Sequence, residues 1–152
     1  MDDLRELYQA TILDHNKAPR NFGKLEDANR QANGDNPVCG DKLVVYLQVD
    51  EDDRVADVRF DGKGCAISTA SASLMTDFVK GRTRSEIDET FDQFHELLTG
   101  NPSEHVDATE LGKLAVFSGV REYPVRVKCA TLCWHTLQAA LDGGNETART
   151  ES

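Results

Sequence analysis

The stretch "KLVVYLQVDEDDRVADVRFDG", residues 42–62, decides the fold, because apolar and polar residues alternate on both sides of a short acidic turn. One face of its first half carries Leu43, Val45, Leu47 and Val49. A period of two residues is typical of a strand with one buried face. Two such runs separated by a polar turn predict a β-hairpin of residues 42–49 and 54–62.

Helical periodicity is present on both sides of this hairpin. Apolar residues recur three or four positions apart at about 3–17, 68–81, 85–98 and 127–141, which predicts four helices. A shorter helix is predicted from Asp107 to about Gly119. The segment 63–68, "KGCAIS", is predicted to be a short third strand or a bend, and residues 21–40 are predicted to be a loop.

The helix at 85–98 has a predicted start and a predicted core face. Ser85 and Asp88 have the spacing of a capping box. The side chains expected to face the core are Ile87, Phe91, Phe94 and Leu98.

These elements predict an α+β fold, with a small antiparallel three-stranded sheet packed against several helices. A chain of 152 residues is large enough for one hydrophobic core. We therefore expect a single domain over residues 1–144 and a disordered tail over residues 145–152.

Charge and composition exclude two classes of partner. The net charge of −10 is the opposite of what binds phosphate backbones or anionic lipid, so we expect neither nucleic acid nor membrane as a partner. The amino terminus, "MDDLRELYQATILDH", has acidic residues where a secretory signal has basic ones, and it lacks a continuous apolar segment. We expect a cytoplasmic protein.

The chain has four cysteines, Cys39, Cys65, Cys129 and Cys133, which allow three disulfide pairings. A reducing cytoplasm favours metal binding or thiol chemistry over disulfides. The first three lie at the ends of predicted elements, where side chains converge. A set of three thiolates and Asp41 would make a tetrahedral zinc site. The spacing alone also fits scattered core cysteines, because no CxxC pair is present.

Four motifs resemble the U-type iron–sulfur cluster assembly proteins in order and approximate spacing: "LYQATILDHNKAPRNFG", "NPVCGD", "FDGKGCAIS" and "VRVKCATLCWHTL". The resemblance covers about residues 3–143 and is to the SufU type of the NifU/IscU-like family. It implies that the metal ligands are Cys39, Asp41, Cys65 and Cys129.

Lys128 and an inserted segment point to one branch of that family. The cluster scaffolds carry a His before the third cysteine, whereas this chain has Lys128. The segment "GNPSEHVDATELGKL", residues 100–114, is similar to an insertion of the SufU branch. The branch implies a zinc-dependent sulfurtransferase in which Cys39 accepts persulfide sulfur from a SufS-like cysteine desulfurase, with downstream iron–sulfur assembly proteins as further partners.

Two alternative functions stay open. One is a scaffold that assembles a [2Fe–2S] cluster or holds iron, and the other is a structural zinc-binding interaction domain. Arg126 and Lys128 are either solvated charges or neighbours that offset the negative charge of the metal site. We interpret Cys133 as a core cysteine, and His15, Trp134 and His135 as structural residues.

Overall fold

The computed structural model describes residues 2–36, 40–99, 114, 116–117, 120, 123–142 and 147–149. Its elements follow the order α1 (Asp2–Lys17), β1 (Arg30–Asn36), β2 (Asp41–Val49), β3 (Val55–Lys63), α2 (Ala66–Val79), α3 (Arg84–Thr99), α4 (Pro124–Leu141) and β4 (Thr147–Arg149). The predicted helix from Asp107 to about Gly119 lies mostly outside the described residues; its described positions 114, 116 and 117 are in a 3₁₀-helical conformation.

The sheet has the strand order β3-β2-β1-β4. Strands β1, β2 and β3 pair antiparallel, which confirms the predicted three-stranded antiparallel sheet and its central hairpin. The short β4 lies parallel to β1, with Ala148 opposite Gly34. The described part of the predicted tail is therefore paired with the sheet at Thr147–Arg149, while the domain limits 1–144 stay a prediction.

The third antiparallel strand is not where the sequence predicted it. It is β1, which lies inside the predicted loop 21–40, and the prediction of a strand or bend at 63–68 is wrong because Lys63 ends β3 and α2 begins at Ala66. Strand β1 has the sequence "RQANGDN", so only Ala32 carries an apolar side chain. Its inward positions are Ala32, Gly34 and Asn36, two of which give no hydrophobic signal.

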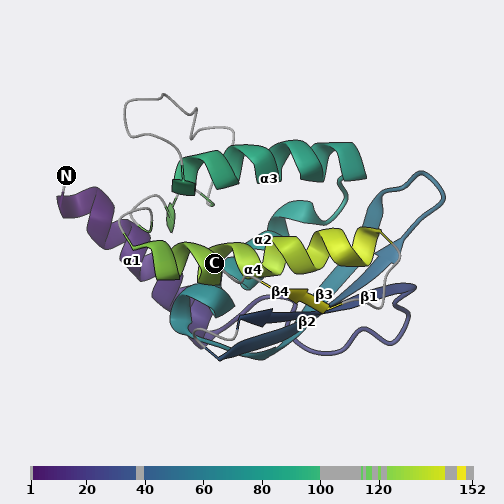
Figure 1. Ribbon diagram of the computed structural model, residues 1–152, viewed down its shortest axis with the longest axis horizontal. Coiled ribbons are helices and arrows are strands. Elements are labelled where there is room, and N and C mark those ends of the chain that lie inside the picture. The colour runs from purple at the N-terminus through teal and green to yellow at the C-terminus, as the bar shows by residue number, and fades with distance from the viewer. Residues whose placement is uncertain are drawn as a thin grey trace.

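The helices lie on one side of the sheet, and α3 lies on the far side of α4 from the strands (Figure 1). Helix α4 packs against β1 and β2, and α2 packs against β3. The ring of Phe91 in α3 stacks on buried Trp134 in α4, with 5.7 Å between ring centroids. Burial of such apolar surface is the main favourable contribution to folding.

Helix α3 confirms the predicted core face but not the predicted cap. Ile87, Phe91, Phe94 and Leu98 are buried. The capping box is formed by Thr83 and Glu86: the Thr83 N–H donates to Glu86 Oε1 at 3.0 Å, and the Glu86 N–H donates to Thr83 Oγ1 at 3.3 Å. The prediction from Ser85 and Asp88 was two residues late, since both pairs have the same spacing.

No helix in the described part of the chain is long and apolar enough to cross a membrane.

Candidate metal centre

Three of the four predicted ligands meet at one end of the sheet. Asp41 opens β2, Cys65 directly precedes α2, and Cys129 lies in α4. Their Sγ and carboxylate oxygen atoms all lie within 4.8 Å of one another. Cys39 lies outside the described residues, so its membership of this group stays a prediction. Its neighbour Gly40 has φ +73°, a backbone conformation that favours glycine.

The Asp41 carboxylate is fully buried and is oriented by the backbone of the next ligand. Its Oδ1 accepts a hydrogen bond from the Cys65 N–H at 2.9 Å, and its Oδ2 lies 4.0 Å from Cys65 Sγ. A Cβ atom at Gly64 would come within 2.9 Å of Asp41 Oδ1. Glycine at this position therefore allows the close approach of the β3–α2 connection to the carboxylate.

Cys65 is the N-cap of α2, and its Sγ accepts from the Ser68 N–H at 3.4 Å. The pKa of Cys65 is lowered to about 6, mainly by the hydrogen bond with Cys129 and further by the Ser68 N–H. Burial and the Asp41 charge oppose this shift of the pKa. The hydrogen bond with Cys129 and, to a lesser extent, the amino terminus of α2 thus favour the thiolate form of Cys65, which binds metals or attacks sulfur.

Cys129 is buried and lies in the second turn of α4, because the helix begins at Pro124 rather than at Val127. The predicted start of this helix at about residue 127, which would place Cys129 in its first turn, is therefore wrong. Proline is well suited to a first helical position, so the apparent break at Pro124 is a helix start. Among the predicted ligands that the structure describes, Cys65 is the one at a helix amino terminus.

The two basic residues before Cys129 lie at the start of α4. The Arg126 guanidinium lies over the ring of Tyr123, 4.9 Å from the ring centroid. Arg126 is exposed, whereas Lys128 is half-buried. Within the described part of the chain neither residue forms an ion pair. Their role in offsetting the negative charge of the site stays a prediction.

Asn36 also belongs to this group and is not among the residues predicted from the sequence. It is fully buried at the end of β1, and its Nδ2 lies 3.5 Å from Asp41 Oδ2 and 3.7 Å from Cys129 Sγ. Its burial depends on strand β1, which the sequence predicted as a loop, so no sequence signal indicated its place in this group.

Cys133, His15 and His135 make contacts of the kind predicted for structural residues. Cys133 is buried beside Ser71, with 3.4 Å between Sγ and Oγ, and burial raises its pKa to about 12. His15 is buried, and its Nδ1 is 2.6 Å from Ser73 Oγ. The His135 ring packs edge-on against Phe91, and burial lowers the pKa of His135.

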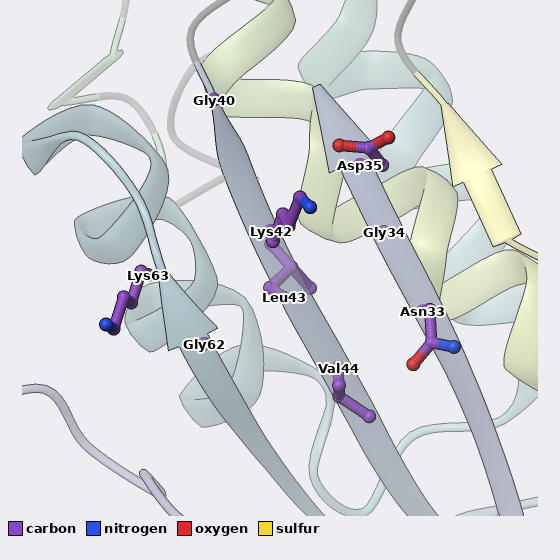
Figure 2. Close-up of a pocket in the computed structure, with 9 residues that line it drawn as sticks. All are labelled: Asn33, Gly34, Asp35, Gly40, Lys42, Leu43, Val44, Gly62 and Lys63. Atoms are coloured by element: carbon purple, nitrogen blue, oxygen red, sulfur yellow. The ribbon is translucent and has the colours of Figure 1, made fainter. Parts of the chain in front are cut away.

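A hollow of about 520 Å³ lies near the same end of the sheet. Figure 2 shows Asp35 and Lys42 on neighbouring strands of its lining, with helices behind the sheet. Lys42 is exposed, whereas its neighbours Asp41 and Leu43 are buried. Because successive strand residues point to opposite faces, this hollow lies on the outer face, and the ligand group faces the helices.

The chemistry of this donor set fits a thiophilic metal ion. Two thiols and one carboxylate converge with little solvent at Asp41 and Cys129, and zinc binds such sulfur and oxygen ligands tetrahedrally. A further thiol, Cys39, is two residues before Asp41 in the sequence. These groups, gathered at one end of the sheet of an α+β domain, form a candidate site for a thiolate-bound metal ion.

The chain belongs to the family described as the NifU-like N terminal domain, which it matches over residues 7–130. It is 38% identical over 146 residues to the zinc-dependent sulfurtransferase SufU of Bacillus subtilis, covering 94% of this chain and 97% of that one. It is 39% identical over 143 residues to the iron–sulfur cluster assembly scaffold protein IscU of Streptococcus pyogenes, and the match covers 93% of this chain and 86% of that one.

A solved structure has the same fold. It is a protein of Fervidobacterium islandicum AW-1 described as a candidate iron–sulfur cluster assembly scaffold for the SUF system. It is 37% identical, the TM-score is 0.79, and the match covers 86% of this chain and 93% of that one. The resemblance to the NifU/IscU-like family is confirmed.

Proposed function

We propose that this protein is a zinc-dependent sulfurtransferase in iron–sulfur cluster assembly, and that Cys39 accepts persulfide sulfur from a cysteine desulfurase. The observation that supports this function is the convergence of Asp41, Cys65 and Cys129 within 4.8 Å. The proposed partners are a SufS-like cysteine desulfurase and downstream iron–sulfur assembly proteins, and the proposed location is the cytoplasm.

The residues proposed to hold zinc are Cys39, Asp41, Cys65 and Cys129. Bound zinc would keep the three thiols deprotonated near neutral pH. Three thiolates and one carboxylate on Zn²⁺ leave a charge of about −2, which nearby cations would offset. Arg126 and Lys128 are proposed to supply this positive charge from the start of α4.

In the proposed transfer, the Cys39 thiolate attacks the outer sulfur of the desulfurase persulfide. One S–S bond forms on Cys39, the S–S bond of the donor persulfide breaks, and the desulfurase cysteine leaves as a thiolate. Cys39 is the best acceptor among the proposed ligands, because Cys65 is tied to the start of α2 and Cys129 is buried inside α4. The neighbouring Gly40 reduces the conformational cost of moving Cys39.

The test is peptide mapping by mass spectrometry after incubation with persulfidated desulfurase. We expect an added sulfur atom on Cys39 of the wild-type protein. The Cys39→Ser variant should fold and bind the desulfurase without accelerating its turnover. A persulfide on Cys129 or Cys133, with Cys39 unmodified, would overturn the assignment.

The second candidate function is a scaffold for a [2Fe–2S] cluster, since thiolates also hold such clusters and one relative of similar identity has that name. Lys128 favours the sulfurtransferase, because a protonated lysine is not an ordinary metal ligand. Elemental analysis of protein purified without added metal separates the two: one zinc per chain and no colour supports sulfur transfer. Bound iron and visible absorption would support the scaffold.

A structural zinc domain is the third candidate. It requires Cys39→Ala to behave like Cys65→Ala, with loss of fold in both variants. The sulfurtransferase predicts that the two variants differ, because Cys39 then carries the sulfur and Cys65 mainly holds the metal.

A further inference from the structure

Asn36 is a buried amide at the end of β1, directly opposite the carboxylate of the candidate metal centre. Its Cα partner across the sheet is Asp41, the last pair in the register of β1 with β2. Its relative exposure is 0%. The two residues lie on adjacent strands and both point toward the helices, so the amide and the carboxylate occupy the same enclosed space.

The amide of Asn36 is placed between two predicted ligands from different elements. Its Nδ2 donates toward Asp41 Oδ2 at 3.5 Å and toward Cys129 Sγ at 3.7 Å. An amide nitrogen carries two N–H donors, so one side chain can serve both acceptors. Both distances are at the long end of the range for hydrogen bonds to oxygen and to sulfur. Hydrogen bonds become shorter and stronger when the acceptor is ionised.

Burying the Asn36 side chain lowers the stability of the fold, which indicates that its two N–H donors have a role at the candidate metal centre. A buried polar group lowers stability unless its hydrogen bonds are made, and within the described residues Asn36 Oδ1 has no hydrogen-bond partner. An apolar residue at this inward strand position would avoid that cost. Aspartate would have nearly the same shape, but it would add a negative charge beside Asp41 and Cys129.

We propose that Asn36 is a positioning residue of the metal site, whose side-chain amide donates to the Asp41 carboxylate and the Cys129 thiolate and thereby sets their orientation and their strength as metal ligands. This inference rests on the metal site of the proposed function. Hydrogen bonds to ligating groups typically alter metal affinity by about 10–100-fold when they are removed.

Two variants and one control test this role. Asn36→Leu removes the donors and keeps approximately the volume, and Asn36→Asp keeps the shape but removes the donors. Asn33→Leu is the control, because Asn33 is an exposed residue on the same strand. Each purified chain is first stripped of metal. Its affinity for Zn²⁺ is then measured by competition with a chromophoric chelator. A second sample is loaded with Co²⁺, and its absorption spectrum is recorded.

We expect both Asn36 variants to bind Zn²⁺ about 10–100-fold more weakly than the wild-type protein. We also expect their thiolate-to-cobalt absorption band to move to longer wavelength, because a thiolate without its N–H donor gives up an electron more readily. Asn33→Leu should match the wild-type protein in both measurements. The band is read on the metal-bound fraction, so weaker binding does not obscure its position.

The outcomes separate the inference from the proposed function. If the wild-type protein binds Co²⁺ with a thiolate band, and Asn36→Asp and Asn36→Leu keep both its affinity and its band position, the inference is overturned and the metal site stands. Weaker binding with an unmoved band also overturns it, since packing alone would explain that result. If the wild-type protein shows no thiolate band with Co²⁺, the metal site itself is wrong.

Discussion

The two ends of the β2–β3 hairpin are built differently. At the turn, Asp50 Oδ1 accepts from the backbone N–H groups of Asp52 and Arg54 at 2.9 and 3.0 Å, and all three residues are exposed. At the opposite end, Asn36 and Asp41 are fully buried, and the Asn36 amide contacts Asp41 at 3.5 Å. The turn exposes its polar groups, whereas the ligand end buries them: Asp41 accepts one short hydrogen bond from the Cys65 N–H at 2.9 Å and a longer one from Asn36.

This difference in burial suits the turn to a purely structural role and the Asp41 end to the proposed metal binding. Buried acceptors lower stability unless they are paired, and a cation is the partner that two thiols and a carboxylate bind best. A fold selected only for stability would favour apolar side chains at such a position. Changes in metal binding are therefore expected to affect the ligand end more strongly than the turn.

Metal removal should have the largest effect. Thiolate zinc sites contribute on the order of 10 kcal/mol near neutral pH, which is comparable with the stability of a whole domain. We expect the melting temperature to fall by many degrees when zinc is removed. Hydrogen exchange should accelerate more at the amides of Cys65 and Ser68, which donate to Asp41 and Cys65, than at the turn amides of Asp52 and Arg54. A metal-free protein as stable as the zinc form would contradict this prediction.

Substitution of a single predicted ligand should have the second-largest effect. Cys65→Ser and Cys129→Ser each remove a thiolate, so we expect loss of zinc after dialysis against a mild chelator, together with a lower melting temperature. The matched control is Cys133→Ala, one helical turn beyond Cys129 in the hydrophobic core. This control should lose about 1–3 kcal/mol of stability and keep its zinc. Zinc content by elemental analysis distinguishes the three variants.

Substitution of an aspartate at each end compares the two ends directly. Asp41→Ala opens a coordination position, so its zinc should exchange with added metal at a different rate from the wild-type protein. Asp50→Ala removes two exposed hydrogen bonds and should cost about 1 kcal/mol in urea unfolding, with no change in zinc exchange. If Asp41→Ala alters neither zinc retention nor sulfur transfer, Asp41 is only a turn residue.

Thiol titration of the metal-free protein should show the smallest effect on stability. The Cys65 pKa is lowered in the folded state, so its contribution to stability is present above its ordinary pKa of 9.0 and is lost as the pH falls through about 6. We expect alkylation of Cys65 by iodoacetamide to reach half its maximal rate near pH 6. Cys133, whose pKa is about 12 and which is buried, should stay unmodified in the folded protein. Equal reactivity of both thiols would contradict the geometry of the site.

The sequence was sufficient to predict strands and helices where their hydrophobic periodicity was strong. The hairpin and the core face of α3 could be predicted because their apolar residues recur with one clear period. Strand β1 could not, because Ala32 is its only apolar side chain and Gly34 and Asn36 fill its inward positions. The start of α4 was placed late, because Pro124 fits both a helix start and a break.

The candidate site was predicted in part. The meeting of Asp41, Cys65 and Cys129 followed from the resemblance of their motifs to the family, although Cys129 lies in the second turn of α4 and not at its start. Asn36 could not be predicted, since its importance depends on the register that sets it opposite Asp41. The role of Cys39 as ligand and sulfur acceptor stays a prediction.

X-ray absorption at the zinc edge tests the central claim most directly, because it reads the ligand atoms around the metal in the native protein. The account predicts three sulfur atoms at about 2.3 Å and one oxygen atom at about 2.0–2.2 Å. In Asp41→Ala the sulfur shell should persist unchanged. A shell of four sulfur atoms, or one made only of oxygen and nitrogen, would contradict the assignment of Cys39, Asp41, Cys65 and Cys129.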